Sequence, residues 1–89
     1  MKYKVEFSEQ CIKDLKKLDR YTKTVIMNWI AKNLEGCENP RVHGKPLVAN
    51  RKGQWRYRIG DYRLVCEIHD SELLIYSISI GHRREIYTR

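Results

Sequence analysis

The stretch that decides the fold is WRYRIGDYRLV, residues 55–65. Apolar and charged residues alternate on both sides of the Gly60-Asp61 pair, which is the pattern of two half-buried strands joined by a two-residue turn. Such a turn places Ile59 opposite Tyr62 and Arg58 opposite Arg63. The stretch therefore predicts a β-hairpin with strands over residues 54–59 and 62–69.

The alternation gives this hairpin two unlike faces. One face carries core-type side chains, namely Trp55, Tyr57, Ile59, Tyr62, Leu64 and Cys66. The other face carries Arg56, Arg58, Arg63, Val65 and Glu67. Arg58 opposite Arg63 is a like-charge pair, which destabilises a sheet, whereas an anion between the two would be held by both guanidinium groups. We interpret the pair as a phosphate site; the alternative is that Glu67 or another carboxylate neutralises it.

Upstream of the hairpin, the pattern predicts one strand and two helices. Residues 2–7 alternate between polar and apolar side chains, as in a strand with one buried face. Ser8 is placed to cap a first helix, and a second helix is expected from about Thr22 to Leu34, with Gly36 ending it. The first helix has the apolar face Ile12, Leu15 and Leu18, and the second has Val25, Ile26, Trp29, Ile30 and Leu34. We expect Trp29 and these aliphatic residues to belong to the core.

Downstream of the hairpin, a third strand is expected over residues 72–80, after a tight turn at Asp70-Ser71. Residues 36–53 form a long connection rich in glycine, proline and basic residues, and long loops are often functional. The order β-α-α-β-β-β predicts an α+β fold with an antiparallel-rich sheet and a helical hairpin packed on one face. At 89 residues, we expect a single domain spanning 1–89 with one modest core.

The charge of the chain favours polyanionic partners. Eighteen Lys and Arg against eleven Asp and Glu give a formal net charge of +7. Residues 1–40 hold seven Lys and one Arg, whereas residues 41–89 hold eight Arg and two Lys. Because the planar guanidinium group binds phosphate through two hydrogen bonds, the second half of the chain is where we look for function.

The cysteine pattern and the hydropathy of the sequence indicate in which cellular compartment the protein is expected. Cys11, Cys37 and Cys66 form an odd set without C-x-x-C spacing, which favours reduced thiols over a zinc site. Neither a signal-peptide pattern nor an apolar run of about 20 residues is present in the sequence. We therefore expect a cytoplasmic protein that does not interact with membranes and needs no metal or other cofactor.

Residues 55–65, together with ISIGHRREIY at 78–87, resemble the RelE branch of the RelE/ParE toxins. The segments GDYRLV and GHRREIY carry the resemblance as a pair, and the order of strands and helices extends it over nearly the whole chain. The resemblance implies a toxin of a type II toxin–antitoxin system, neutralised by an antitoxin encoded beside it. It also implies cleavage of messenger RNA in the ribosomal A site, without a metal, through attack of the neighbouring 2′-hydroxyl on the scissile phosphate.

The resemblance also implies roles for individual residues. Arg63 matches an arginine that contacts the scissile phosphate, and Arg83 matches one that acts as acid or charge stabiliser. Tyr87 matches a tyrosine that stacks on a base. Arg56 and Arg58 stand where the best-known RelE proteins have two lysines, one of them the proposed base. Because arginine stays protonated, both are expected to bind phosphate and neither is an easy proton acceptor.

The proton acceptor must then lie elsewhere. Histidine exchanges a proton near neutral pH, which favours His82, and a lysine among cations loses its proton more readily, which makes Lys52 a second candidate. Counting from a turn at Asp70-Ser71 places His82 on the Arg63 face of the sheet and Arg83 on the opposite face, unless Gly81 breaks the alternation. The resemblance instead places Arg83 in the site. We keep both, and expect Arg84 to add a further contact to RNA.

Other candidates are weaker, and other functions remain open. His43 lies in a loop and His69 beside a turn, so we expect both to be merely exposed. One alternative function is a ParE-type toxin that inhibits DNA gyrase without cutting RNA. Another is an inactive homologue that binds only an antitoxin or nucleic acid. The positive charge favours an acidic antitoxin segment over the basic groove, and direct reading of DNA is expected only through the antitoxin.

Overall fold

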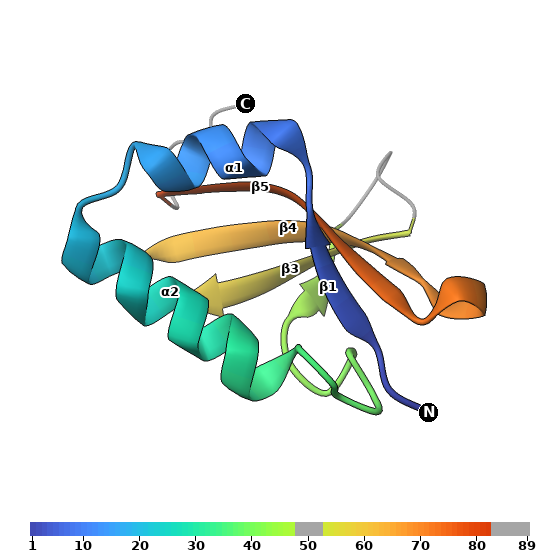
Figure 1. Ribbon diagram of the computed structural model, residues 1–89. Helices are drawn as coiled ribbons and strands as arrows, with labels where there is room; N and C mark the ends of the chain where they lie inside the picture. The colour runs from blue at the N-terminus through green and yellow to red at the C-terminus, as the bar shows by residue number, and fades with distance from the viewer. Residues whose placement is uncertain (48–52, 83–89) are drawn as a thin grey trace.

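The sheet and the two helices are seen in the computed structural model, which describes residues 1–47 and 53–82. The elements in chain order are β1 (Lys4–Phe7), α1 (Glu9–Lys16), α2 (Arg20–Asn33), β2 (Lys45–Pro46), β3 (Gln54–Ile59), β4 (Tyr62–His69), the 3-10 turn η1 (Asp70–Glu72) and β5 (Leu74–His82). The strands form one sheet in the order β1-β5-β4-β3-β2, in which β1 is parallel to β5 and all other neighbours are antiparallel. The predicted α+β fold is confirmed, with both helices on the same face of the sheet (Figure 1).

The core lies between the helices and this face of the sheet. The helices contribute Cys11, Leu15, Ile26, Ile30 and Leu34, and the sheet contributes Tyr57, Ile59, Leu64, Cys66, Ile75 and Ile80. Two predicted core positions are wrong, because Ile12 and Val25 are each 43 % exposed. In α1 the buried side chains are Cys11, Asp14 and Leu15, so Ile12 lies beside the packed stripe. Leu18 follows the end of α1 and still packs against the core.

Capping residues fix where the helices begin. The Ser8 hydroxyl oxygen accepts a hydrogen bond from the Cys11 N–H at 3.0 Å, as predicted for an N-cap. Asp19 caps α2 in the same way by accepting from the Thr22 N–H at 3.1 Å, and the helix therefore begins at Arg20, two residues earlier than expected. No helix in residues 1–47 and 53–82 is long and apolar enough to cross a bilayer.

Helix α1 replaces β1 along the outer edge of β5. The parallel pairing ends at Phe7 opposite Ser77, so no strand among residues 1–47 and 53–82 pairs with the second half of β5 on that side. The Ser8 hydroxyl donates to the Ile78 carbonyl at 2.6 Å, and the Ile80 N–H donates to the Asp14 carboxylate at 3.1 Å. Asp14 is 8 % exposed, and this bond accounts for a carboxylate at such depth, since buried polar groups require partners.

The connection between β4 and β5 differs from the prediction in two ways. In place of a two-residue turn at Asp70-Ser71, η1 and the left-handed residue Leu73 (φ 51°) place His69 opposite Leu74. In addition, the pairing shifts between Val65 and Cys66, which face residues 79 and 77, so that residue 78 is an extra residue in β5. Strand β5 therefore occupies Leu74–His82 in place of 72–80. A one-residue bulge also exchanges the two faces of the strand beyond it.

Candidate functional site

The β3–β4 hairpin presents a row of cations on the face away from the helices. The predicted two-residue turn is confirmed, since Ile59 pairs with Tyr62 and Arg58 pairs with Arg63. The short strand β2, which the sequence did not predict, extends the row because Lys45 pairs with Arg56. Register alone thus collects one lysine and three arginines from three neighbouring strands.

Arg63 is the anchored member of this row. Its residue is 6 % exposed, whereas Arg58 is exposed, and its Nη1 donates to the Tyr62 carbonyl at 3.2 Å. Arginine is seldom buried to this extent in proteins. The Glu67 carboxylate, the predicted alternative partner of the cluster, lies 3.1 Å from His69 Nε2. A guanidinium group held at a fixed depth is suited to binding a planar or tetrahedral anion through paired hydrogen bonds.

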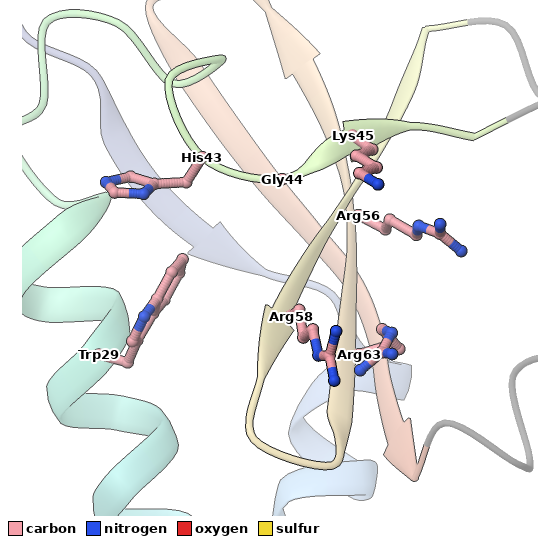
Figure 2. A pocket seen from close by; sticks show the side chains of 7 residues that line it. All are labelled: Trp29, His43, Gly44, Lys45, Arg56, Arg58 and Arg63. Atoms are coloured by element: carbon pink, nitrogen blue, oxygen red, sulfur yellow. The ribbon is translucent and has the colours of Figure 1, made fainter.

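These cations line a pocket of about 430 Å³ at the β3 edge of the sheet. The pocket is lined by Trp29, His43, Gly44, Lys45, Arg56, Arg58 and Arg63. Figure 2 shows two sides: Trp29 of α2 and His43 on one, and the guanidinium groups of Arg58 and Arg63 on the other. Among the described residues, no carboxylate lines the pocket. The pocket is therefore strongly cationic on its strand side and aromatic on its helix side.

The loop that carries His43 is fixed to β3. The Trp55 indole N–H donates to the His43 carbonyl at 2.7 Å, and the Tyr57 hydroxyl donates to the Pro40 carbonyl at 2.7 Å. Gly44 has φ 78°, and a Cβ built on it would lie 2.2 Å from the Arg56 carbonyl oxygen. A glycine is thus required both by the backbone angle and by the close approach to the strand. The loop brings His43 and Lys45 to the pocket in a defined position.

His82 does not lie where the strand count predicted. It pairs with Tyr62, and the two rings meet edge to face with centroids 5.6 Å apart. Tyr62 belongs to the helix-covered face of the hairpin, so His82 is on the face opposite to Arg63. The cause is the bulge at residue 78. The longer turn shifts the register of β5 against β4 by two residues, which leaves each side chain on its predicted face, whereas the one-residue bulge moves His82 to the other face. His82 lines a different pocket of about 380 Å³, beside Asp14 and Lys17 of the α1 region.

Four predicted site residues, Lys52, Arg83, Arg84 and Tyr87, lie outside the described residues. Their roles stay predictions from the resemblance. Of the predicted residues that the structure describes, Arg56, Arg58 and Arg63 are brought together in the pocket. The described residues contain no group of three His, Cys, Asp or Glu side chains placed to hold a metal ion.

Sequence reasoning missed the three side chains, those of Trp29, His43 and Lys45, that reach the pocket from outside the hairpin. Trp29 was assigned to the core, and it is in fact half-buried: it packs on Tyr57 and also lines the pocket. His43 is exposed as predicted, yet it stands against Trp29 with ring centroids 5.7 Å apart. Lys45 was only one of several basic loop residues. The one signal in the sequence was the concentration of basic residues in the 36–53 connection, which does not specify a position.

The sequence model of the family described as "ParE toxin of type II toxin-antitoxin system, parDE" matches residues 5–87. The chain belongs to the RelE/ParE superfamily of type II toxins. It is 30 % identical to toxin RelG of Mycobacterium tuberculosis over 89 residues, covering 100 % of both chains. It is also 31 % identical to a RelE-like toxin protein of Escherichia coli over 85 residues, 93 % of this chain and 85 % of that protein.

Solved structures agree with this assignment. The structure of the toxin–antitoxin complex RelBE2 from Mycobacterium tuberculosis contains a chain that matches with a TM-score of 0.84 and 28 % identity, over 93 % of each chain. The matching family model is named for ParE, while these relatives carry the names RelE-like, RelG and RelBE2. The superfamily is therefore established.

Proposed function

We propose that this toxin is a ribosome-dependent endoribonuclease that cleaves messenger RNA by attack of a 2′-hydroxyl on the adjacent phosphate. The observation that carries the proposal is the direct pairing of Arg58 with Arg63 at a pocket without a carboxylate among its described lining residues. In such a reaction negative charge grows on the phosphoryl oxygens. Positioned guanidinium groups stabilise that charge without having to reorganise. The relative named RelE-like supports this choice within the superfamily.

The three arginines have different parts in this proposal. Arg63 is buried and anchored, so it is the one suited to fix the scissile phosphate. Arg58, exposed and directly opposite, contributes a second guanidinium to the same anion, and Arg56 extends the cationic row toward Lys45 along β3 and β2. Arginine does not accept a proton at physiological pH, so none of the three serves as the base.

Proton transfer then falls to other groups. His43 is the described pocket-lining residue whose imidazole ring can accept or donate a proton. Lys52 remains the second candidate acceptor, and Arg83 and Tyr87 keep the roles of charge stabiliser and base-stacking residue that the resemblance implies. His82 is not proposed for the reaction, because it lies on the other face of the sheet.

We also propose a cognate antitoxin, encoded beside the toxin, as the physiological partner. The net charge of +7 favours an antitoxin with an acidic segment over the cationic pocket, which would block access of RNA. The matched RelBE2 structure is a toxin–antitoxin complex, which supports a partner of this kind. The site of action is proposed to be the ribosomal A site, in the cytoplasm.

The proposal is tested by producing the chain in cells without its antitoxin and mapping RNA 5′ ends. The matched strains carry an Arg58→Ala, Arg63→Ala double variant and an Arg20→Ala control, since Arg20 is exposed at the start of α2. New ends inside translated codons are expected for the original chain and the control. They should be absent in the double variant and when translation is blocked.

A ParE-type inhibitor of DNA gyrase is the second candidate, and the name of the matching family model favours it. This activity predicts growth arrest without new RNA ends, together with inhibition of purified gyrase in a supercoiling assay. That pair of results would overturn the nuclease proposal. Normal growth without new ends would instead indicate a homologue that only binds an antitoxin or nucleic acid.

A further inference from the structure

The cationic pocket has an aromatic side, formed by Trp29 and His43, of which the proposed reaction uses only the His43 imidazole. Trp29 packs on Tyr57 with ring centroids 5.7 Å apart at 52°, and it also lines the pocket. The His43 ring stands edge to face against Trp29 at 5.7 Å and 68°. Two aromatic rings from different elements thus form one side of the pocket, which we call the aromatic wall (Trp29 and His43).

We propose that the aromatic wall binds the base of a nucleotide whose phosphate lies on Arg58 and Arg63. This inference rests on the proposed function and deepens it, since it assigns a base-binding subsite to the same pocket. Figure 2 places the wall and the two guanidinium groups on opposite sides of the pocket. A nucleotide has the matching arrangement, because a planar aromatic base and an anionic phosphate stand at opposite ends of a sugar.

The size and chemistry of the pocket fit such a ligand. A volume of about 430 Å³ is within the range of small-molecule sites. Stacking of a base on an aromatic side chain strengthens binding by about 5- to 150-fold and tolerates all four bases. The exposed His43 ring adds a hydrogen-bonding edge beside the indole. The wall therefore favours the presence of a base and does not by itself select its identity.

The wall is also held in place before any ligand arrives. Tyr57, against which Trp29 packs, is fully buried and donates its hydroxyl to the Pro40 carbonyl. The His43 carbonyl accepts from the Trp55 indole, and Gly44 lies directly against β3. Both rings are thus anchored to β3, the strand that also carries Arg58. Anchoring of this kind reduces the ordering cost of binding.

Binding of two small probes to the purified toxin tests the inference. Adenosine 5′-monophosphate carries a base, whereas ribose 5-phosphate has the same phosphate and sugar without one. Calorimetric titration is expected to give adenosine 5′-monophosphate an affinity about 5- to 150-fold higher. In Trp29→Leu its affinity should fall to that of ribose 5-phosphate. Unchanged binding of ribose 5-phosphate in that variant shows that the pocket remains folded.

Two further measurements make the result specific. Tyr21 is 77 % exposed on the same helix, so Tyr21→Leu removes an aromatic ring outside the pocket and should keep the preference for the nucleotide. The fluorescence of the original chain, whose two tryptophans are Trp29 and Trp55, should be quenched by adenosine 5′-monophosphate and not by ribose 5-phosphate. This fluorescence measurement tests the inference even if Trp29→Leu fails to fold.

Three results would overturn the inference in distinguishable ways. Equal affinity for the two probes, or a preference that survives in Trp29→Leu, removes the base-binding subsite and leaves the phosphate site intact. Failure of both probes to bind removes the phosphate site as well, and with it the main support for the proposed function. Tighter binding of the acidic dipeptide Phe-Asp than of the nucleotide would assign the wall to a protein partner.

Discussion

Arg58 and Arg63 stand directly opposite each other across the β3–β4 turn, on the face of the sheet that the helices leave open. Two like charges at this position weaken the hairpin unless an anion lies between them. Arg63 is buried while Arg58 is exposed, so the pair offers one fixed and one adjustable donor group. The free energy of unfolding of the protein should therefore depend on which anion is present.

The first prediction concerns this dependence on anions. Arg58→Gln should raise the free energy of unfolding by about 0.2–1 kcal/mol in chloride, because it removes the repulsion from Arg63. It should also reduce the stabilisation that sulfate gives relative to chloride at equal ionic strength, because a bound anion stabilises the folded state. Thermal melts in both salts measure the two effects. Arg20→Gln, which removes the same charge from the exposed start of α2, should leave the sulfate effect unchanged.

The second prediction is that RNA cleavage depends on the face of the sheet that carries Arg63 and not on the face that carries His82. Arg63→Gln should lower the cleavage rate by about 10²–10³-fold, the usual effect of removing a group that stabilises charge in the transition state. His82→Gln should keep the rate within about threefold, because its ring packs on Tyr62 on the opposite face. Cleavage of a message on purified ribosomes measures both rates. A large loss in His82→Gln would contradict the placement of the site on the Arg63 face alone.

The hairpin was predictable because its information is local. A Gly-Asp pair between two alternating runs sets both the turn and the register. The predicted pairs Ile59–Tyr62 and Arg58–Arg63 are formed, and the same register continues to Gln54–Glu67. The Ser8 cap was predictable for the same reason, since one side chain and one N–H three residues later define it. The cationic face followed from the hairpin without any information about the rest of the fold.

The position of His82 was not predictable, because it depends on residue 78. Gly81 in ISIGH could break the alternation, but the extra residue is 78, next to the point where β1 ends and α1 takes over the β5 edge. The roles of Trp29 and His43 depend likewise on how α2 and the loop meet β3. These features depend on contacts between segments far apart in the chain, and the periodicity within one segment does not predict such contacts.

The third prediction compares two glycines that share a backbone angle. Gly44 and Gly53 have φ of 78° and 81°, but a Cβ would meet the Arg56 carbonyl at 2.2 Å in the first and nothing within 4 Å in the second. Gly53→Ala should therefore cost about 1 kcal/mol, from the backbone angle alone. Gly44→Ala should cost at least about 3 kcal/mol, because the loop must also move away from β3. Equal losses in urea unfolding would show that the loop is not held against the strand.

The fourth prediction concerns the pH dependence of a cluster that ties three segments together. The Asp70 carboxylate accepts two hydrogen bonds from the Arg41 guanidinium, both at 3.0 Å, and one from the Tyr3 hydroxyl at 2.7 Å. The Arg41 guanidinium, and after it the Tyr3 hydroxyl, holds the pKa of Asp70 below its ordinary value of 3.8. The hydrogen bond to Asp70 in turn raises the pKa of Tyr3 above its ordinary value of 10.0.

The sign of each shift sets the pH window in which the cluster stabilises the fold. A lowered carboxyl pKa stabilises the folded state above pH 3.8 and loses that effect as the pH falls through the folded value. A raised tyrosine pKa stabilises below pH 10.0 and loses that effect as the pH rises through the folded value. Asp70→Asn should therefore lower the free energy of unfolding by about 0.5–1 kcal/mol at neutral pH, a small value because the pair is about half exposed. The difference from the original chain should shrink below pH 3.8 and above pH 10.0, as urea titrations across this range would show. A difference that stays constant at low pH would mean that the Asp70 charge does not contribute to stability.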